Sequence, residues 1–121
     1  MTGQALSADA AIPVPSGQEV TLLDVIWNEP GPEGLTTRFR FLAPAISQED
    51  GSVDFELAVE DMAHLCQNYA LPRVEDNVPV PQQIIITLSD RPVAFGETAP
   101  DATQFFEAYR IEDGLCIWEI Y

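Results

Sequence analysis

The dipeptide Asp113-Gly114 constrains the fold of this chain more than any other feature, because it separates two apolar runs at residues 103–111 and 115–121. An Asp-Gly pair between two strand-like runs is a strong signal for a β-hairpin with a two-residue turn. The C-terminal end of the chain is therefore expected to form two antiparallel strands. A three-residue turn would shift the cross-strand pairing by one position.

Further runs of residues earlier in the chain have strand character. They lie at 19–27, 35–42 and 83–88, and residues 93–95 add a short edge strand. The run at 35–42 alternates apolar and polar side chains, as a strand with one buried face does. Two prolines and two glycines at 28–34 predict a turn between the first two strands.

One helix is expected between the second and third of these strands. Ser52 or Asp54 serves as the N-cap, and Pro72 ends the helix because the residue before a proline avoids helical dihedral angles. The apolar stripe of this helix consists of Ala58, Met62, Leu65, Cys66 and Tyr69.

The order of these elements predicts an α+β fold. We expect an antiparallel sheet of five to six strands, in the order β-β-α-β-β-β, with one helix packed across one face. Residues 19–121 form this single domain, and residues 1–18 form a flexible N-terminal arm.

The charge of the chain excludes two classes of partner. Twenty acidic residues stand against five arginines, and the net charge is −15. Proteins that bind nucleic acids or anionic membranes use basic side chains to neutralise phosphates. We therefore expect no nucleic-acid partner, and no apolar run is long enough for membrane insertion as a helix.

The two cysteines, Cys66 and Cys116, form neither a C-x-x-C motif nor a zinc-binding pattern. A two-residue turn pairs Ile111 with Cys116 and puts Cys116 on the core face, together with Tyr109 and Trp118. Cys66 belongs to the apolar stripe of the helix that must cover this face. Both sulfurs therefore point into one layer, and we predict a Cys66–Cys116 disulfide. The alternative is a pair of free buried thiols in a cytosolic protein.

The opposite face of the hairpin carries Phe106, Ile117 and Tyr121. Phe106 and Tyr121 are cross-strand neighbours if the turn has two residues, and Ile117 lies nearby. We predict that these three side chains form an interaction surface, because together they exceed what a charged surface usually leaves uncovered. The alternative interpretation is scattered surface hydrophobic residues, which are common.

The arginines suggest a second kind of site. Arg38, Arg40 and Arg91 are candidates for binding an anion between the helix and the sheet, since guanidinium groups suit carboxylate and phosphate recognition. The alternative is that each arginine pairs with a neighbouring acidic residue.

Signatures of catalysis and of cofactor binding are missing from the sequence. His64 is the one histidine, which excludes a histidine-rich metal site. No serine-nucleophile motif and no glycine-rich phosphate loop is present. We therefore predict no catalytic residues, no metal and no cofactor.

Four stretches of the chain carry a family resemblance: HLCQNYALPR at 64–73, SDRPV at 89–93, QFFEAY at 104–109 and CIWE at 116–119. They resemble a family of small uncharacterised bacterial proteins, typically made with an export signal, over roughly residues 13–121. The resemblance implies an exported, disulfide-bearing domain that is periplasmic or secreted, and it brings no activity and no site residues. Residues 1–18 lack the basic start and the apolar run of a signal peptide, so a cytoplasmic location is the alternative.

Two functional hypotheses follow. The first is a non-enzymatic protein-interaction module that binds an unknown protein or a second copy of itself, through the outer face of the sheet or the loop at 28–34. The second is a small anion- or ligand-binding domain, or an enzyme, that uses the arginines.

Overall fold

The computed structural model describes residues 11–31, 34–47 and 52–119. Within these ranges it contains five strands, a short 3₁₀ turn and one helix in three consecutive parts. The elements in chain order are β1 (Thr21–Gly31), β2 (Gly34–Leu42), η2 (Pro44–Ile46), α1 (Phe55–Leu65), the π-helical segment η3 (Cys66–Ala70), α2 (Leu71–Val74), β3 (Gln83–Ser89), β4 (Gln104–Glu112) and β5 (Leu115–Glu119).

The strands form one sheet in the order β1-β2-β3-β4-β5, which confirms the α+β class. All neighbouring pairs are antiparallel except β2 and β3, which are parallel. The helix carries the chain back along the sheet before β3 begins, and such a crossover gives two parallel strands. The short strand expected at 93–95 does not form, and these residues belong to the loop between β3 and β4.

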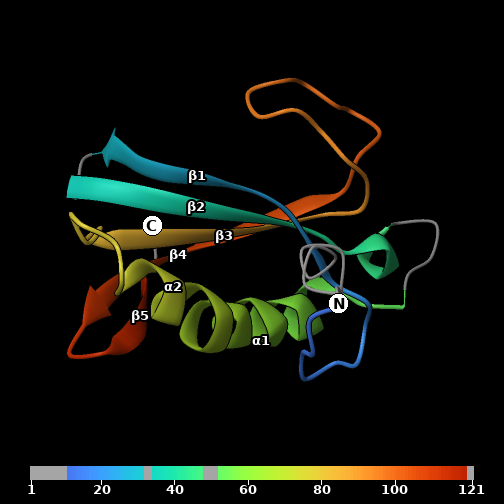
Figure 1. Ribbon diagram of the computed structural model, residues 1–121. Coiled ribbons are helices and arrows are strands. Elements are labelled where there is room, and N and C mark those ends of the chain that lie inside the picture. The colour runs from blue at the N-terminus through green and yellow to red at the C-terminus, as the bar shows by residue number, and fades with distance from the viewer. Residues whose placement is uncertain (1–10, 32–33, 48–51, 120–121) are drawn as a thin grey trace, which may run out of the picture.

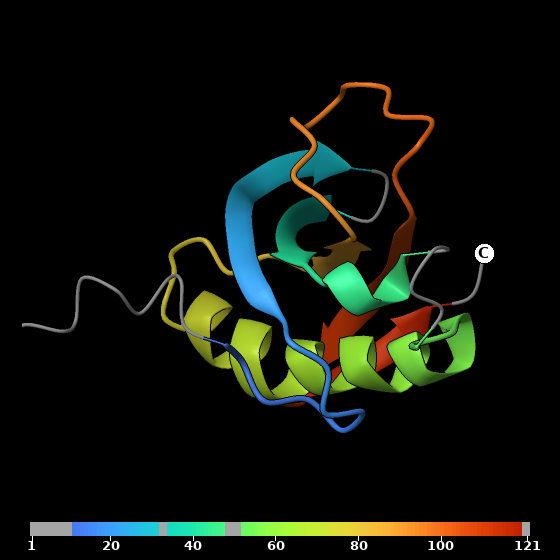
Figure 2. The same ribbon diagram turned by 90° about the vertical axis from the view of Figure 1, so that its right-hand side faces the viewer.

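The helix packs on one face of the sheet, and the hydrophobic core lies between them (Figures 1 and 2). Alternation along each strand turns one set of side chains toward the helix. The fully buried apolar residues of β2 and β3 are Phe39, Phe41, Ile84, Ile86 and Leu88. The helix contributes the fully buried residues Ala58, Met62, Leu65 and Cys66 of the predicted stripe.

The helix begins as predicted but ends later. Asp54 is the N-cap, and its carboxylate accepts a hydrogen bond from the backbone N–H of Leu57 at 3.0 Å. The expected end at Pro72 is wrong, because the helix continues through η3 into α2. Pro72 lies at the first positions of α2. The wide π-helical turn of η3 directly precedes this position and lets the helix accept the proline.

One buried carboxylate holds the segment before β1 against α1. Asp61 has no exposed surface and accepts three hydrogen bonds. The donors are the backbone N–H of Ser16 at 2.9 Å, the hydroxyl of Ser16 at 2.6 Å and the side-chain amide of Gln18 at 2.7 Å. Of the arm expected over residues 1–18, the described part is therefore docked on the helix.

The C-terminal hairpin has the predicted two-residue turn. Asp113 and Gly114 have φ angles of 55° and 75°, and Tyr109 pairs with Trp118 as predicted. Tyr109 is 2% exposed, but Trp118 is 51% exposed, so its expected place in the core is wrong. The reason is that β5 is the outermost strand. At this edge of the sheet, the indole N–H of Trp118 donates a hydrogen bond to the Glu107 carboxylate at 2.6 Å.

The predicted disulfide between Cys66 and Cys116 is confirmed. Their Cα atoms are 6.3 Å apart, within the usual range for a bridge. Beside the bridge, the Gln67 side chain donates a hydrogen bond to the Gly114 carbonyl at 3.1 Å and accepts one from the Cys116 N–H at 2.9 Å. The bridge and this amide together tie the helix to the hairpin.

The buried phenol of Tyr109 should make the fold less stable at alkaline pH. Burial raises the pKa of Tyr109 above its ordinary value, and the charge of Glu107 raises it further. Above the ordinary tyrosine pKa of about 10, the unfolded chain therefore loses a proton that the folded chain keeps. We expect the free energy of unfolding to fall as the pH rises above about 10, and to fall less steeply in Tyr109→Phe.

Urea unfolding at a series of pH values measures this effect. Comparison of the wild type with Tyr109→Phe at pH 7 gives the effect of the missing hydroxyl itself, apart from the pH dependence. The same slope in Tyr109→Phe as in the wild type would contradict the prediction.

Candidate functional site

The loop between β3 and β4, residues 90–103, rises from the sheet on the side away from the helix (Figure 2). We call this side the outer face. Asp90 closes the base of the loop, because its N–H donates to the Thr103 carbonyl at 3.0 Å and its carboxylate accepts from the Thr103 N–H at 3.1 Å. The side chain of Asp90 is 2% exposed. The loop therefore leaves the sheet from a fixed base.

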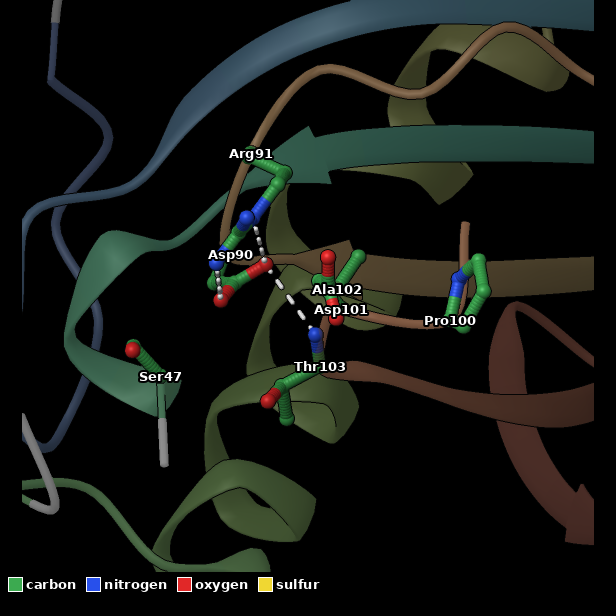
Figure 3. A pocket seen from close by; sticks show the side chains of 7 residues that line it. All are labelled: Ser47, Asp90, Arg91, Pro100, Asp101, Ala102 and Thr103. Carbon is green, nitrogen blue, oxygen red and sulfur yellow. Dashed lines mark hydrogen bonds and ion pairs between the residues drawn. The ribbon is translucent and has the colours of Figure 1, made fainter. Parts of the chain in front are cut away.

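A cavity of about 370 Å³ lies beside this base (Figure 3). Arg91 lines the cavity, and its guanidinium group pairs with the Asp90 carboxylate at 3.2 Å. Asp101 adds a second carboxylate to the lining. Because two acidic groups accompany the arginine, the charge of this cavity does not favour an anion.

Arg38 and Arg40 lie on the outer face, so their expected position between the helix and the sheet is wrong. Phe39 and Phe41 of β2 point into the core under the helix. Alternating side chains on a strand point to opposite faces. The pattern that buries the two phenylalanines therefore turns the arginines away from the helix.

The outer face and the 90–103 loop enclose a cleft of about 170 Å³, which we call the outer cleft. Its floor comes from three adjacent strands, because Arg40, Thr87 and Phe106 are register partners across β2, β3 and β4. The loop supplies the opposite wall. The residues that line the cleft are Arg38, Arg40, Thr87, Val93, Ala94, Phe95, Gly96, Glu97, Gln104 and Phe106.

Arg40 ties the loop to the sheet. It is 5% exposed and forms an ion pair with Asp24 at 2.7 Å. It also donates a hydrogen bond to the Val93 carbonyl, and its guanidinium carbon lies 5.7 Å from the centre of the Phe95 ring. The charge of Arg40 is therefore balanced within the protein, and its contacts position the wall of the cleft.

Arg38 has an unused hydrogen-bond donor. Its Nε atom is buried and has no partner among the described residues, and Arg38 forms no ion pair with any of them. Its guanidinium carbon lies 5.2 Å from the centre of the Phe95 ring. Burial lowers the pKa of Arg38, the Glu29 charge opposes that change, and the Arg40 charge adds to it. An anion bound here would offset this unfavourable environment.

Thr87 is a second polar group in the cleft without a partner. It is 8% exposed, and its buried Oγ1 has no hydrogen-bond partner among the described residues. An unpaired buried polar group costs about 1–3 kcal/mol, so two of them in one cleft require an explanation. Thr87 was not predicted from the sequence. The one signal for it was a polar residue that interrupts the apolar run of β3.

The predicted interaction surface is divided in the structure. Phe106 is 64% exposed and lines the outer cleft. Ile117 is half-buried opposite Arg110. Along the hairpin, the Ala108–Glu119 pair separates Ile117 from the position of Phe106. Tyr121 lies outside the described residues. Phe106 is thus brought together with two of the predicted arginines, and association through this surface stays a prediction.

The described ranges contain neither a candidate metal site nor a candidate membrane-spanning helix. No group of three or more His, Cys, Asp or Glu side chains there could hold a metal ion. No helix in the same ranges is long and apolar enough to cross a membrane.

Fold and site together define the class: a disulfide-bonded α+β domain with a small cleft under a loop on the outer face of its sheet. The chain belongs to DUF6497, a family of unknown function, whose model matches residues 1–121. The match agrees with the resemblance to a family that has no assigned activity. No curated protein and no solved structure matches the chain.

Proposed function

We propose that this protein is a non-enzymatic binding domain whose outer cleft holds an anionic group of its ligand. The observation that supports this function is the presence, in one cleft, of the Arg38 guanidinium, whose Nε has no partner among the described residues, and of the unpartnered Thr87 hydroxyl. Both groups donate hydrogen bonds, and an anion accepts them. Ligand sites combine apolar lining with converging polar groups, and this cleft contains both kinds of residue.

The loop supports the proposal because it forms a wall of the cleft that is already in position. Its base is closed by hydrogen bonds between Asp90 and Thr103. Farther along, the Val93 carbonyl is bonded to Arg40, and the Phe95 ring lies over both arginines. A site that is built before the ligand arrives loses less conformational entropy on binding.

We expect small anions to bind at Arg38. Titration of the ¹⁵N-labelled chain with acetate, benzoate and inorganic phosphate should shift the Nε–H signal of Arg38 and the amide signal of Thr87 for at least one of them. Arg38→Gln should weaken that binding about tenfold or more, the loss that a charge-assisted hydrogen bond explains.

Arg110→Gln is the matched control, because it removes the same charge from an exposed arginine of β4 outside the cleft. It should leave the affinity nearly unchanged. The proposal fails if no anion shifts the cleft signals, or if both variants weaken binding equally.

A second candidate function is association with another protein or with a second copy of this chain through Phe106. The 64% exposure of this large ring favours it. Sedimentation of the wild-type protein and of Phe106→Ser, alone and in native extract, tests this function. It is rejected if the two proteins sediment identically.

We also infer that the protein works in an oxidising compartment, periplasmic or extracellular. The disulfide supports this location, because such bridges persist in oxidising compartments and are rare in the cytosol. Trapping the thiols in native cells before lysis tests the inference, and two free thiols would instead favour the cytoplasm.

A further inference from the structure

We propose that the ligand of the outer cleft is a monocarboxylate with an aromatic or branched apolar body. This inference rests on the proposed anion-binding function. It assigns to that site a ligand charge, a head group and a size.

The balance of charge around the cleft limits the ligand to one negative charge. The charge of Arg40 is already matched by Asp24 at 2.7 Å, and Glu97 adds a carboxylate to the lining. Among the described lining residues, Arg38 is therefore the cation left for a ligand. A second negative charge on the ligand would meet these acidic groups and the field of a chain with a net charge of −15.

The unpaired donors fit the two oxygens of a carboxylate. The Nε–H of Arg38 and the hydroxyl of Thr87 are both buried, and neither has a partner among the described residues. A carboxylate accepts both bonds with one planar group. Gln104 lies in the same lining and supplies an amide that can donate a third bond.

Two aromatic rings provide the apolar part of the site. Phe95 on the loop is 50% exposed and Phe106 on β4 is 64% exposed, and both line the cleft. A ligand ring that packs on them would cover apolar surface now in contact with water. The cleft measures about 170 Å³. An engineered protein cavity of about 150 Å³ holds benzene, so the space fits one ring-sized body.

A panel of four probes separates charge, head group and body: benzoate, benzamide, acetate and phenyl phosphate. Each is titrated at pH 7.5 into the full chain and followed by calorimetry and by the signals of Arg38 and Thr87. We expect benzoate to bind at least about tenfold more tightly than any other probe, a difference of about 1.4 kcal/mol.

Three variants assign the effect to the cleft. Arg38→Gln should abolish the preference for benzoate over benzamide, and Arg110→Gln should retain it. Phe106→Ala should weaken benzoate but not acetate. If Arg38→Gln does not fold, Thr87→Val removes the other donor at nearly constant shape, and it should weaken benzoate severalfold.

The outcomes distinguish this inference from the function on which it rests. If phenyl phosphate binds through Arg38 as tightly as benzoate, the inferred carboxylate head group is wrong. If acetate does, the inferred apolar body is wrong. In both cases anion binding stands. If benzamide equals benzoate, or if no probe shifts the cleft signals, both are overturned.

Discussion

Loss of the Cys66–Cys116 bridge should lower the free energy of unfolding by about 4 kcal/mol. The two cysteines are 50 residues apart in sequence. A bridge over a loop of this length restricts the unfolded chain, and its removal returns that conformational entropy. The effect is large for a domain of this size, because total stabilities are about 5–15 kcal/mol. The measurement is urea unfolding of the oxidised protein and of the protein kept in reductant.

Two comparisons isolate the bridge from the packing of its sulfur atoms. The reduced protein keeps both sulfurs, whereas a Cys66→Ala/Cys116→Ala double variant also leaves a cavity at the fully buried Cys66. The variant should therefore be the less stable of the two. Hydrogen exchange should show that β5 loses protection first, since the bridge ties this edge strand to the helix. A change below about 1 kcal/mol on reduction would contradict the prediction.

Asp61→Asn should lower the free energy of unfolding by about 2–3 kcal/mol. The carboxylate is fully buried and accepts three hydrogen bonds from Ser16 and Gln18. An amide has the same shape but one acceptor oxygen. In either orientation its NH₂ group faces a donor that the carboxylate had satisfied. The segment before β1 should then detach from α1.

Urea unfolding measures the stability of Asp61→Asn, and limited proteolysis near Ser16 measures the detachment. Glu60→Gln is the matched control, because it removes one negative charge from an exposed position on the same helix. Its stability should stay within about 0.5 kcal/mol of the wild type. If Asp61→Asn is as stable and as protease-resistant as Glu60→Gln, Asp61 does not hold the segment.

Local features of the sequence predicted the parts of the fold that depend on near neighbours. The Asp113-Gly114 pair favours a two-residue turn, and the register that this turn gives is the one observed. The carboxylate of Asp54 caps the helix at one of the two predicted positions. The same reasoning failed at Pro72, because a wide π-helical turn before it lets the helix accept a proline.

The sequence predicted some residues of the candidate site but not their arrangement. Alternation along β2 identified Arg38 and Arg40 as a pair on one face, but their expected place under the helix was wrong. Phe106 was assigned to a different surface. Thr87 was not considered, because its significance depends on a missing hydrogen-bond partner, and such a property exists only after the strands and the loop have come together.

The sequence alone determined relations within one strand, one helix or one turn. These are which side chains share a face, where the helix begins, and how the two strands of the hairpin pair. These relations depend on backbone periodicity and on turn chemistry, which nearby residues set. Tertiary structure alone decided that β3 lies parallel to β2 and that the edge position of β5 exposes Trp118. It also decided that the 90–103 loop covers the outer face. Each of these depends on contacts between segments far apart in the chain, and no short run of residues encodes them.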